Sequence, residues 1–335
     1  MIRRNGTSPA LFLAACLLAG CGPERAPAGP PVTRPVIDGD RLTVRDGTSL
    51  PLSIWTPGDD AASNVLALHS FGDFRLAFEG LGPELAAHGH RVLAIDQRGF
   101  GETHPFGIWP TGDTLVSDLR DLLAATRARW PDVPVHLLGE SMGGSVVINA
   151  AAAGDLDGVE SLILAAPGVR EGIPFRYGWN ALLFATSLVA PWLSLHNDQA
   201  KPPLSDVANA RLGEDPRILR DIRVDTYYGL LRFADAASAH AGALRRPTLL
   251  IYGTADDFVI PASICALLRD APGPVEPRIV EGGVHRILHQ AGVDQPKADI
   301  RAWLDGRRNL EPAVDTLMPV DRVCDEIDRS SPGTS

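Results

Sequence analysis

Three residue types that together perform acyl transfer occur along this chain in the order serine, aspartate, histidine. Ser141 stands at the centre of Gly139-Glu140-Ser141-Met142-Gly143, between a mostly apolar run at 133–138 and an Ala- and Val-rich stretch at 145–153. Strand, sharp turn and helix is the context in which a serine hydroxyl stands clear of a sheet as a nucleophile. Small residues two positions before and after the serine let strand and helix approach closely. Because the motif is short, its interpretation depends on partners downstream.

The expected partners follow two later strands. Residues 249–253 form an apolar run that ends in glycine, and Asp256 comes three positions later. A short strand at 278–280 leads through Gly282-Gly283 to His285. A serine hydroxyl becomes an effective nucleophile when an imidazole takes its proton, and a carboxylate fixes the imidazole tautomer and stabilises the imidazolium. We therefore predict Ser141 as nucleophile, His285 as base and Asp256 as the acid.

Two neighbouring residues compete for these roles. Asp257 adjoins Asp256 and alternatively caps the next segment or faces solvent; Asp256 is preferred because its spacing from the glycine at the strand end fits the fold. His289 lies about one helical turn beyond His285 and is the weaker candidate for the base. His285 could alternatively be an ordinary surface histidine, but its place after Gly-Gly and the last strand favours catalysis.

The elements that must position these residues alternate along the chain. Helical patterns such as 77–88 and 114–129 lie between most of the near-continuous apolar runs, which are 65–68, 92–95, 135–138, 162–165, 248–252 and 278–280. Buried apolar strands that alternate with helices predict a mostly parallel sheet in an α/β domain. Two extended runs around Asp46-Gly47 predict an N-terminal antiparallel hairpin at the edge of this sheet.

The alternation is interrupted between about residues 169 and 245, where the pattern is helical and no strand is clear. This stretch carries an apolar stripe that consists of Trp179, Phe184, Leu188, Val189, Trp192 and Leu193. The stripe fits either a packed core helix or a helical lid over the serine with its apolar face toward the substrate. An insertion of this length between two predicted strands favours the lid.

Four short blocks of sequence carry a resemblance to a known family. They are Leu-His-Ser-Phe-Gly-Asp at 68–73, Asp-Gln-Arg-Gly-Phe-Gly-Glu-Thr at 96–103, the serine motif at 139–143, and residues 253–261 together with 283–285. In this order they resemble α/β-hydrolases of the monoacylglycerol lipase and lysophospholipase type, which are also grouped with serine aminopeptidases. The resemblance covers residues 36–305 and implies the α/β-hydrolase fold with the triad named above. It says less about substrate, because this fold hosts many chemistries.

The resemblance also implies an oxyanion hole formed by the backbone N–H groups of Phe71 and Met142. Removing one such donor costs about 3–4 kcal/mol of transition-state stabilisation in other enzymes. The family usually has His-Gly where this chain has His69-Ser70, and glycine there allows unusual dihedral angles. Ser70 in place of glycine is therefore expected to reshape the loop that carries the donor at Phe71. Arg98 is expected to brace loops at the carboxyl edge of the sheet rather than to contact substrate.

Composition excludes several classes of protein. The chain has 335 residues, of which 45% are hydrophobic and 21% charged, which is ordinary for one large or two small globular domains. Its net charge is −10 and no run of Lys and Arg is longer than about a pair, so nucleic acid is not an expected partner. The sequence has no cluster of Cys and His with ligand spacing, and we expect neither a metal nor an organic cofactor.

The N-terminus reads as an export signal rather than as part of the fold. Arg3 and Arg4 precede an apolar stretch at 10–19, which ends in Leu18-Ala19-Gly20-Cys21. The cysteine after small residues resembles a bacterial lipobox, which predicts cleavage after residue 20 and lipidation of Cys21; several acyl chains would then anchor the protein to a membrane. The alternative is a simple signal peptide with an incidental cysteine. The lipoprotein interpretation places the protein in the cell envelope, at the outer membrane or its periplasmic face.

Two further segments lie outside the predicted domain at 36–305. Residues 21–35 are rich in Pro, Ala and Gly and are expected to form a disordered tether. Residues 306–335 are polar and are expected to form a loosely held tail. In an exported mature chain Cys265 and Cys324 are the remaining cysteines that could pair. The sequence favours neither this disulfide nor two free thiols.

The sequence thus predicts a lipid-anchored, exported serine hydrolase that cleaves carboxylic esters of apolar acyl groups. Monoacylglycerols and lysophospholipids are the expected substrates, and the membrane is a partner through Cys21. The same triad would also serve an aminopeptidase, a thioesterase or a carbon–carbon bond hydrolase. Dehalogenases are disfavoured because they carry aspartate at the position of Ser141. A non-catalytic binding lipoprotein that has kept the fold is the alternative from a different class.

Overall fold

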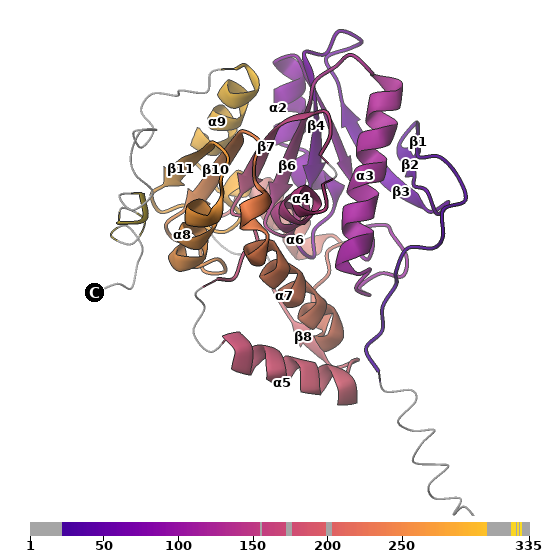
Figure 1. Ribbon diagram of the computed structural model, residues 1–335, viewed down its shortest axis with the longest axis vertical. Coiled ribbons are helices and arrows are strands. Elements are labelled where there is room, and N and C mark those ends of the chain that lie inside the picture. The colour runs from indigo at the N-terminus through magenta and orange to yellow at the C-terminus, as the bar shows by residue number, and fades with distance from the viewer. Residues whose placement is uncertain are drawn as a thin grey trace, which may run out of the picture.

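A nine-stranded sheet forms the centre of the protein in the computed structural model, with the strand order β1-β2-β3-β5-β4-β6-β7-β10-β11 (Figure 1). The structure describes residues 22–154, 156–171, 176–198 and 203–306, together with 323–325, 327 and 329. The strands of this sheet are β1 (Val36–Asp38), β2 (Arg41–Thr43), β3 (Ser49–Trp55), β4 (Ser63–Leu68), β5 (His90–Ile95), β6 (Val135–Glu140), β7 (Val159–Ala165), β10 (Thr248–Gly253) and β11 (Val275–Val280).

The pairing of the strands confirms the predicted fold class. Neighbouring strands from β5 through β4, β6, β7 and β10 to β11 are parallel. Strands β1, β2 and β3 pair antiparallel with one another, and β3 joins the parallel part by pairing antiparallel with β5. The hairpin predicted around Asp46-Gly47 is β2–β3, and the turn uses Gly47 at a φ of 84°. Strand β1 extends this hairpin beyond the prediction.

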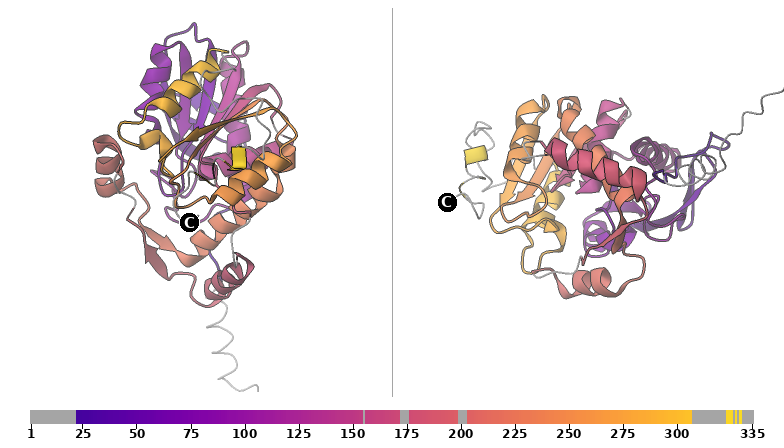
Figure 2. Two further views of the ribbon diagram at one scale, coloured as in Figure 1. Left: turned by 90° about the vertical axis from the view of Figure 1, so that its left-hand side faces the viewer. Right: turned by 90° about the horizontal axis from the view of Figure 1, so that it is seen from below.

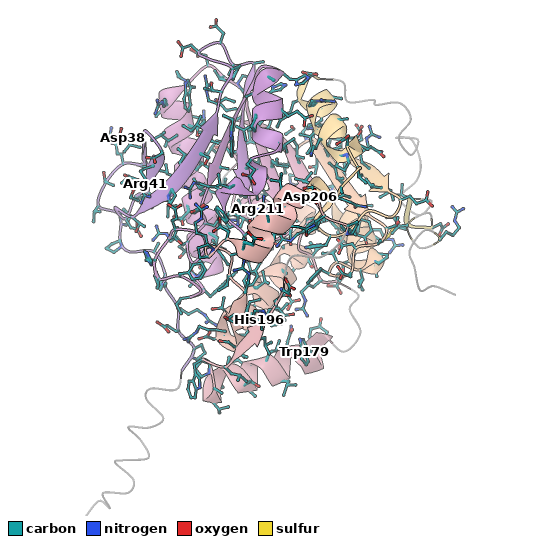
Figure 3. All side chains as sticks on the ribbon, turned by 180° about the vertical axis from the view of Figure 1, so that it is seen from behind. Asp38, Arg41, Trp179, His196, Asp206 and Arg211 are labelled. Atoms are coloured by element: carbon teal, nitrogen blue, oxygen red, sulfur yellow. A yellow bond between two sulfur atoms is a disulfide. The ribbon has the colours of Figure 1, made fainter. Side chains whose placement is uncertain are left out.

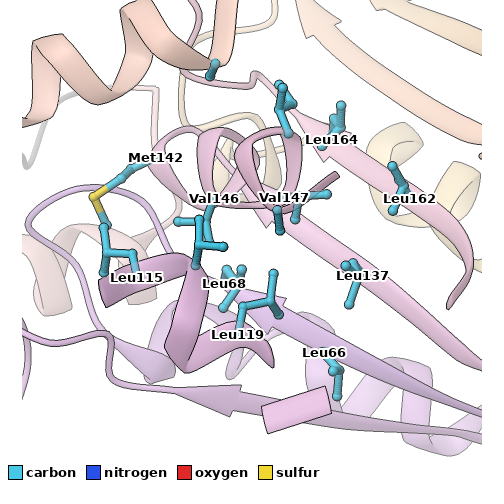
Figure 4. Packing of buried hydrophobic residues seen from close by; sticks show 14 of the residues in the cluster. Leu66, Leu68, Leu115, Leu119, Leu137, Met142, Val146, Val147, Leu162 and Leu164 are labelled. Atoms are coloured by element: carbon cyan, nitrogen blue, oxygen red, sulfur yellow. The ribbon is translucent and has the colours of Figure 1, made fainter. Parts of the chain in front are cut away.

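Helices cover both faces of the sheet. Successive strand residues point to opposite faces, so neighbouring residues of one strand belong to two different cores. Leu66 of β4 and Leu137 of β6 belong to the core under α3 (Gly112–Arg129), α4 (Met142–Ala152) and α8 (Pro261–Asp270). Their neighbours Val65 and Leu138 belong to the core under α2 (Leu81–Ala87) and α9 (Gln295–Leu304). Figure 4 shows the first of these cores, in which side chains from α3 and α4 meet the strands.

One predicted helix is divided in two. The pattern at 77–88 predicted a single helix, but the structure has a 3₁₀ helix, η1 (Arg75–Phe78), followed by α2. Gly80 precedes α2, and Pro83 lies in the first turn of α2, where the absence of its N–H group removes no helical hydrogen bond. Glycine and proline at these positions favour a new helix start over a continuous helix.

The segment between β7 and β10, called here the inserted segment, gathers at one end of the molecule (Figures 1 and 2). It contains α5 (Arg176–Val189), β8 (Ser194–His196), α6 (Asp206–Glu214), β9 (Asp221–Arg223), α7 (Val224–Ala239) and the 3₁₀ helix η2 (Ala241–Ala243). Strands β8 and β9 form an antiparallel pair that was not predicted. Each is three residues long and β8 is exposed throughout, so neither shows the apolar run of a buried strand.

The apolar stripe of α5 is largely exposed, so the prediction of a packed core helix is wrong, and Trp179 is the stripe residue that lines the cavity next to Ser141. Trp179, Phe184, Leu188 and Val189 are 43–67% exposed, and so are Trp192 and Leu193 just beyond the helix. The face of α5 that packs against α7 instead buries Asn180, Leu183 and Ser187. Asn180 donates a hydrogen bond of 2.7 Å to Asp235 of α7. Because this inner face contains two polar residues, hydrophobic patterning assigns the wrong side of the helix to the interior.

The Pro-, Ala- and Gly-rich segment lies along the domain rather than forming a disordered tether. Its backbone N–H groups donate to acceptors on several elements: Glu24 to Asp225 at 2.9 Å, Ala26 to the Trp109 carbonyl at 3.0 Å, Ala28 to Thr114 at 2.9 Å, Gly29 to Asp46 at 2.9 Å, and Val32 to the Arg45 carbonyl at 2.7 Å. We call residues 24–33 the N-terminal strap. Its prolines and glycines disfavour a helix or a strand. The backbone N–H groups of its other residues are therefore available to donate to the domain.

Part of the C-terminal segment is also fixed to the domain. Cys324 forms a disulfide with Cys265 of α8, which decides between the two interpretations of these cysteines. Val323, Cys324 and Ile327 are buried against the main core, so the prediction of a loosely held tail is wrong for these residues. Among the described residues no helix is long and apolar enough to cross a membrane.

Removing this bridge is expected to lower the stability of the fold. The two cysteines are 59 residues apart in sequence, and chain entropy in the unfolded state then assigns the bridge about 4 kcal/mol. The double variant Cys265→Ala/Cys324→Ala should therefore melt several degrees lower in a thermal scan. A reductant should lower the melting temperature of the wild type and leave that of the double variant unchanged. Equal melting temperatures for all samples would contradict this expectation.

Candidate active site

The turn between β6 and α4 presents Ser141 in a strained backbone conformation. Ser141 has φ 51° and ψ −113°, a combination that residues other than glycine rarely adopt. The chain reverses so tightly that a Cβ on Gly139 would meet the backbone of Gly143, and one on Gly143 would collide with the carbonyl oxygen of Leu68. The two glycines of the motif are therefore required by close packing of α4 on the sheet. The strained turn directs the side chain of Ser141 away from both the sheet and α4.

The three predicted catalytic side chains lie in direct contact. Ser141 Oγ is 2.8 Å from His285 Nε2. His285 Nδ1 is 2.8 Å from Asp256 Oδ2 and 3.0 Å from Oδ1. Since an ionised carboxylate only accepts hydrogen bonds, the proton of the neutral ring lies on Nδ1, which leaves Nε2 free to accept from the serine. This arrangement is the one that activates a serine for attack on a carbonyl carbon.

Backbone contacts between two loops align the acid with the base. Asp256 follows β10 and His285 follows β11, and the N–H of Ala255 donates to the carbonyl of Gly283 at 2.9 Å. Asp256 Oδ1 accepts two backbone N–H groups, from Phe258 and Val259, at 2.8 Å each. The side chain of Asp256 is fully buried. The carboxylate is therefore held in one orientation.

The competing residues have other positions. Asp257 is exposed, and its neighbour Asp256 is the one that contacts His285. His289 lies in the 3₁₀ helix η3 (Ile287–His289), and its Nε2 is 3.1 Å from Glu140 Oε2 rather than near the serine. The preference for Asp256 and His285 thus agrees with the geometry.

Both residues expected to form the oxyanion hole line the same cavity as the serine. This cavity has a volume of about 510 Å³, and Phe71 and Met142 lie in its wall together with Ser141 and His285. Met142 is the first residue of α4, so its N–H has no acceptor within the helix. Much of the remaining lining is apolar and comes from the inserted segment, with Trp179, Leu204, Ile222, Tyr227, Leu230, Leu231 and Ala234.

Two buried carboxylates lie next to the site and were not predicted. Asp73 contacts Arg286 at 2.8 Å and Arg211 of α6 at 3.3 Å. Burial disfavours its charge, but these guanidinium groups lower the pKa of the Asp73 carboxyl to about 2. Figure 3 shows Arg211 on α6, close to the main body of the fold. The ion pair between Asp73 and Arg211 links the inserted segment to the loop that carries Phe71.

Glu140, which immediately precedes the serine, is the second carboxylate. It is completely buried and accepts hydrogen bonds from Ser70 Oγ at 2.9 Å and from His289 Nε2 at 3.1 Å. Burial disfavours its charge, yet His289 and Arg286 lower the pKa of the Glu140 carboxyl to about 2. The available signals were a glutamate inside the serine motif and a serine where the family usually has glycine. Neither signal reveals that the two side chains meet.

Arg98 has the bracing role expected of it. Its guanidinium group contacts Asp46 in the β2–β3 turn at 2.7 Å and Asp118 of α3 at 2.8 Å. Of the predicted site residues, Cys21 lies outside the residues that the structure describes. Within the described residues, no group of three His, Cys, Asp or Glu side chains is arranged to hold a metal ion.

Comparison with known proteins identifies the family. The model of the family described as serine aminopeptidase, S33, matches residues 59–291. The chain belongs to this family. Curated relatives include the monoacylglycerol lipase of Mycolicibacterium smegmatis, 23% identical over 77% of this chain and 93% of the relative, and the human monoglyceride lipase, 27% identical over 80% and 89%.

Solved structures agree on the fold of this family member. A soluble variant of the monoglyceride lipase of Saccharomyces cerevisiae, solved with a substrate analog, aligns with a TM-score of 0.67 at 18% identity and covers 85% of this chain and 98% of that one. The monoacylglycerol lipase of Paleococcus ferrophilus aligns with a TM-score of 0.63 at 21% identity, covering 77% and 99%. The predicted α/β-hydrolase fold and serine hydrolase class are confirmed.

The contact between Asp256 and His285 predicts how replacing the carboxylate changes kcat. Asp256→Asn should keep the fold but lower kcat about 10⁴-fold, because the amide favours the wrong imidazole tautomer. Asp257→Asn is the matched control, since it makes the same chemical change on a neighbour that lines the cavity while Asp256 is the residue bonded to His285, and its kcat should fall far less than that of Asp256→Asn. The measurement is steady-state hydrolysis of a p-nitrophenyl ester by both variants. Equal losses in the two variants would contradict the assignment.

Proposed function

We propose that this protein hydrolyses carboxylic esters of apolar acyl groups through an acyl-enzyme on Ser141. The contact of 2.8 Å between Ser141 Oγ and His285 Nε2, with Asp256 behind the imidazole, is the observation that carries the proposal. The cavity in front of the serine supports an apolar substrate, because apolar side chains such as Leu204, Ile222 and Leu231 line it. Monoacylglycerols and lysophospholipids are the substrates we favour, in line with the named activities of the relatives.

The proposed mechanism uses each group in turn. His285 Nε2 takes the proton of Ser141 as Oγ attacks the ester carbonyl, and Asp256 stabilises the imidazolium. The N–H groups of Phe71 and Met142 bind the oxyanion of the tetrahedral intermediate. His285 then gives its proton to the leaving alcohol, which breaks the ester bond and leaves an acyl-serine. Water activated by His285 hydrolyses this intermediate and restores the serine.

Replacing the nucleophile tests this mechanism. Ser141→Ala should lower the hydrolysis of p-nitrophenyl esters by about 10⁴-fold or more and abolish labelling by a fluorophosphonate probe. A panel of esters of increasing chain length, amino-acid anilides and thioesters should show highest kcat/KM for esters with long acyl groups. Full activity of Ser141→Ala would refute the mechanism. Preference for anilides or thioesters would instead favour the aminopeptidase or thioesterase alternatives, and no labelling of the wild type would favour a binding protein.

We further propose that the protein works at a membrane, where lipidated Cys21 anchors it in the cell envelope. The outer surface of α5 and the residues after it supports this. Residues 177–195 contain no charged side chain. The exposed large apolar side chains of this segment are those of Tyr177, Trp179, Leu182, Phe184, Leu188, Val189, Trp192, Leu193 and Leu195. Contiguous apolar surface of this kind is typical of membrane or protein contacts.

Two features connect this apolar surface to the cavity of Ser141 and to the proposed anchor at Cys21. Trp179 lines the cavity and is also 48% exposed, so the outer surface of α5 reaches the cavity that holds the serine. The N-terminal strap begins at the same end of the molecule, where Glu24 bonds to Asp225 and lies 3.3 Å from Arg223 in an ion pair. An anchor at Cys21 would therefore enter beside the inserted segment. In this proposal the inserted segment is a lid whose outer face meets the lipid.

Substituting the apolar surface separates membrane contact from chemistry. Leu182→Ser/Leu188→Ser should lower the hydrolysis of monoacylglycerol in phosphatidylcholine vesicles, because each leucine that enters the bilayer contributes roughly 1.5 kcal/mol, about a factor of ten in binding. Hydrolysis of the soluble ester p-nitrophenyl acetate should be unchanged. Val36→Ser on β1, which is similarly exposed at 51%, is the matched control and should behave as wild type. Equal rates on vesicles for all three proteins would argue against this surface.

A further inference from the structure

The buried carboxylate of Glu140 joins three of the four segments that carry the proposed catalytic groups; the fourth is the loop of Asp256. Ser70 Oγ donates to it at 2.9 Å from the loop after β4, which also carries Phe71. His289 Nε2 donates at 3.1 Å from the segment that begins at His285. Glu140 itself is bonded to Ser141. One charged group thus joins the oxyanion loop, the nucleophile turn and the segment of the base.

The orientation of the N–H of Phe71 follows from contacts of Ser70. The Ser70 carbonyl belongs to the same peptide unit as this N–H, and in a planar trans peptide the two groups point in opposite directions. That carbonyl accepts from His69 Nδ1 at 2.8 Å and from the N–H of Asp73 at 3.2 Å. His69 is itself fixed, because its Nε2 accepts the N–H of Gln97 at 3.0 Å. The peptide unit is therefore held on its carbonyl side within the loop.

The hydroxyl of Ser70 connects this loop to the nucleophile turn. The contacts just described hold the loop to itself and to Gln97 after β5, and the Ser70 hydroxyl adds the link to Glu140, the residue before Ser141. The second oxygen, Glu140 Oε1, has no hydrogen-bond partner in the part of the chain that the structure describes, so Ser70 supplies one of the two donors to a fully buried charge. Glycine, which is usual at this position in the family, has no side chain to make such a link.

We propose that Ser70 is a positioning residue, whose hydrogen bond to Glu140 sets the N–H of Phe71 at the distance from Ser141 that binding of the oxyanion requires. The proposal rests on the proposed function, because it concerns the same ester hydrolysis. Small displacements of catalytic donors are costly, since the oxyanion is bound by fixed groups rather than by mobile water. The contribution of Ser70 therefore belongs to the transition state rather than to binding of the substrate.

The variant Ser70→Ala removes the hydroxyl and little else. We expect kcat for a p-nitrophenyl ester to fall about tenfold, with KM within about twofold of the wild type, because only the transition state carries the oxyanion. Affinity for an aryl boronic acid, which forms a tetrahedral adduct with the serine, should fall by a similar factor. Ser70→Thr keeps a hydroxyl and should recover most of the loss.

The control is Ser63→Ala at the opposite end of β4. Ser63 is equally buried and its hydroxyl also bonds a side chain, His90 Nδ1 at 2.9 Å. Its removal should change the melting temperature as much as Ser70→Ala does, without lowering kcat. If Ser70→Ala changes only the melting temperature and leaves kcat and boronate affinity at wild-type values, Ser70 is merely structural and the proposal is wrong.

A double-mutant cycle tests whether Ser70 acts through Glu140. Glu140→Gln alone should lower kcat in the same direction, and adding Ser70→Ala to it should cost less than Ser70→Ala costs in the wild type. Additive losses would overturn the route through Glu140. A wild type that neither hydrolyses esters nor reacts with a fluorophosphonate overturns the proposed function and this inference with it. An active wild type with an unaffected Ser70→Ala overturns the inference alone.

Discussion

The close packing of α4 against the sheet is the constraint on which the rest of the site depends. Gly139 and Gly143 bring helix and strand so near that the turn between them is left with a positive φ at Ser141. Such a conformation is costly and persists where surrounding packing enforces it. Here the enforcement comes from Val146, Val147 and their neighbours, which are fully buried under α3 and against the strands. The reactivity of one hydroxyl is thus supported by the main hydrophobic core.

Parallel pairing explains why residues far apart in sequence meet at this turn. β4, β6, β10 and β11 all run in one direction, so the loops that follow them emerge along the same edge. Those loops carry Phe71, Ser141, Asp256 and His285 in that order. Contacts between adjacent loops, such as the one from Ala255 to Gly283, then fix their relative height. Beneath them, buried Asp73 and Glu140 are compensated by arginine, histidine and hydroxyl groups rather than by solvent.

The sequence predicts features that depend on local pattern and fails for those that depend on long-range contact. Apolar runs locate the parallel strands, and glycine spacing locates Ser141 and His285. The same logic misassigns α5, because its inner face includes two polar residues. Asn180 bonds to Asp235 of α7, and the hydroxyl of Ser187 donates to the Phe184 carbonyl within α5 itself. It also misses that the N-terminal strap donates to the domain, since the acceptors, such as Asp225 and Thr114, lie about 200 and 86 residues away. The pairing of Cys265 with Cys324 likewise needed the fold.

The position of the inserted segment in the chain has a consequence for the time at which reactivity can arise. It separates β7 from β10, so Ser141 is synthesised well before Asp256 and His285. During vectorial synthesis or transport the N-terminal part of a chain emerges first. A chain that has emerged only as far as α7 can contain the serine turn yet has no imidazole to remove the serine proton. The nucleophile therefore remains inert until the last two strands have joined the edge of the sheet.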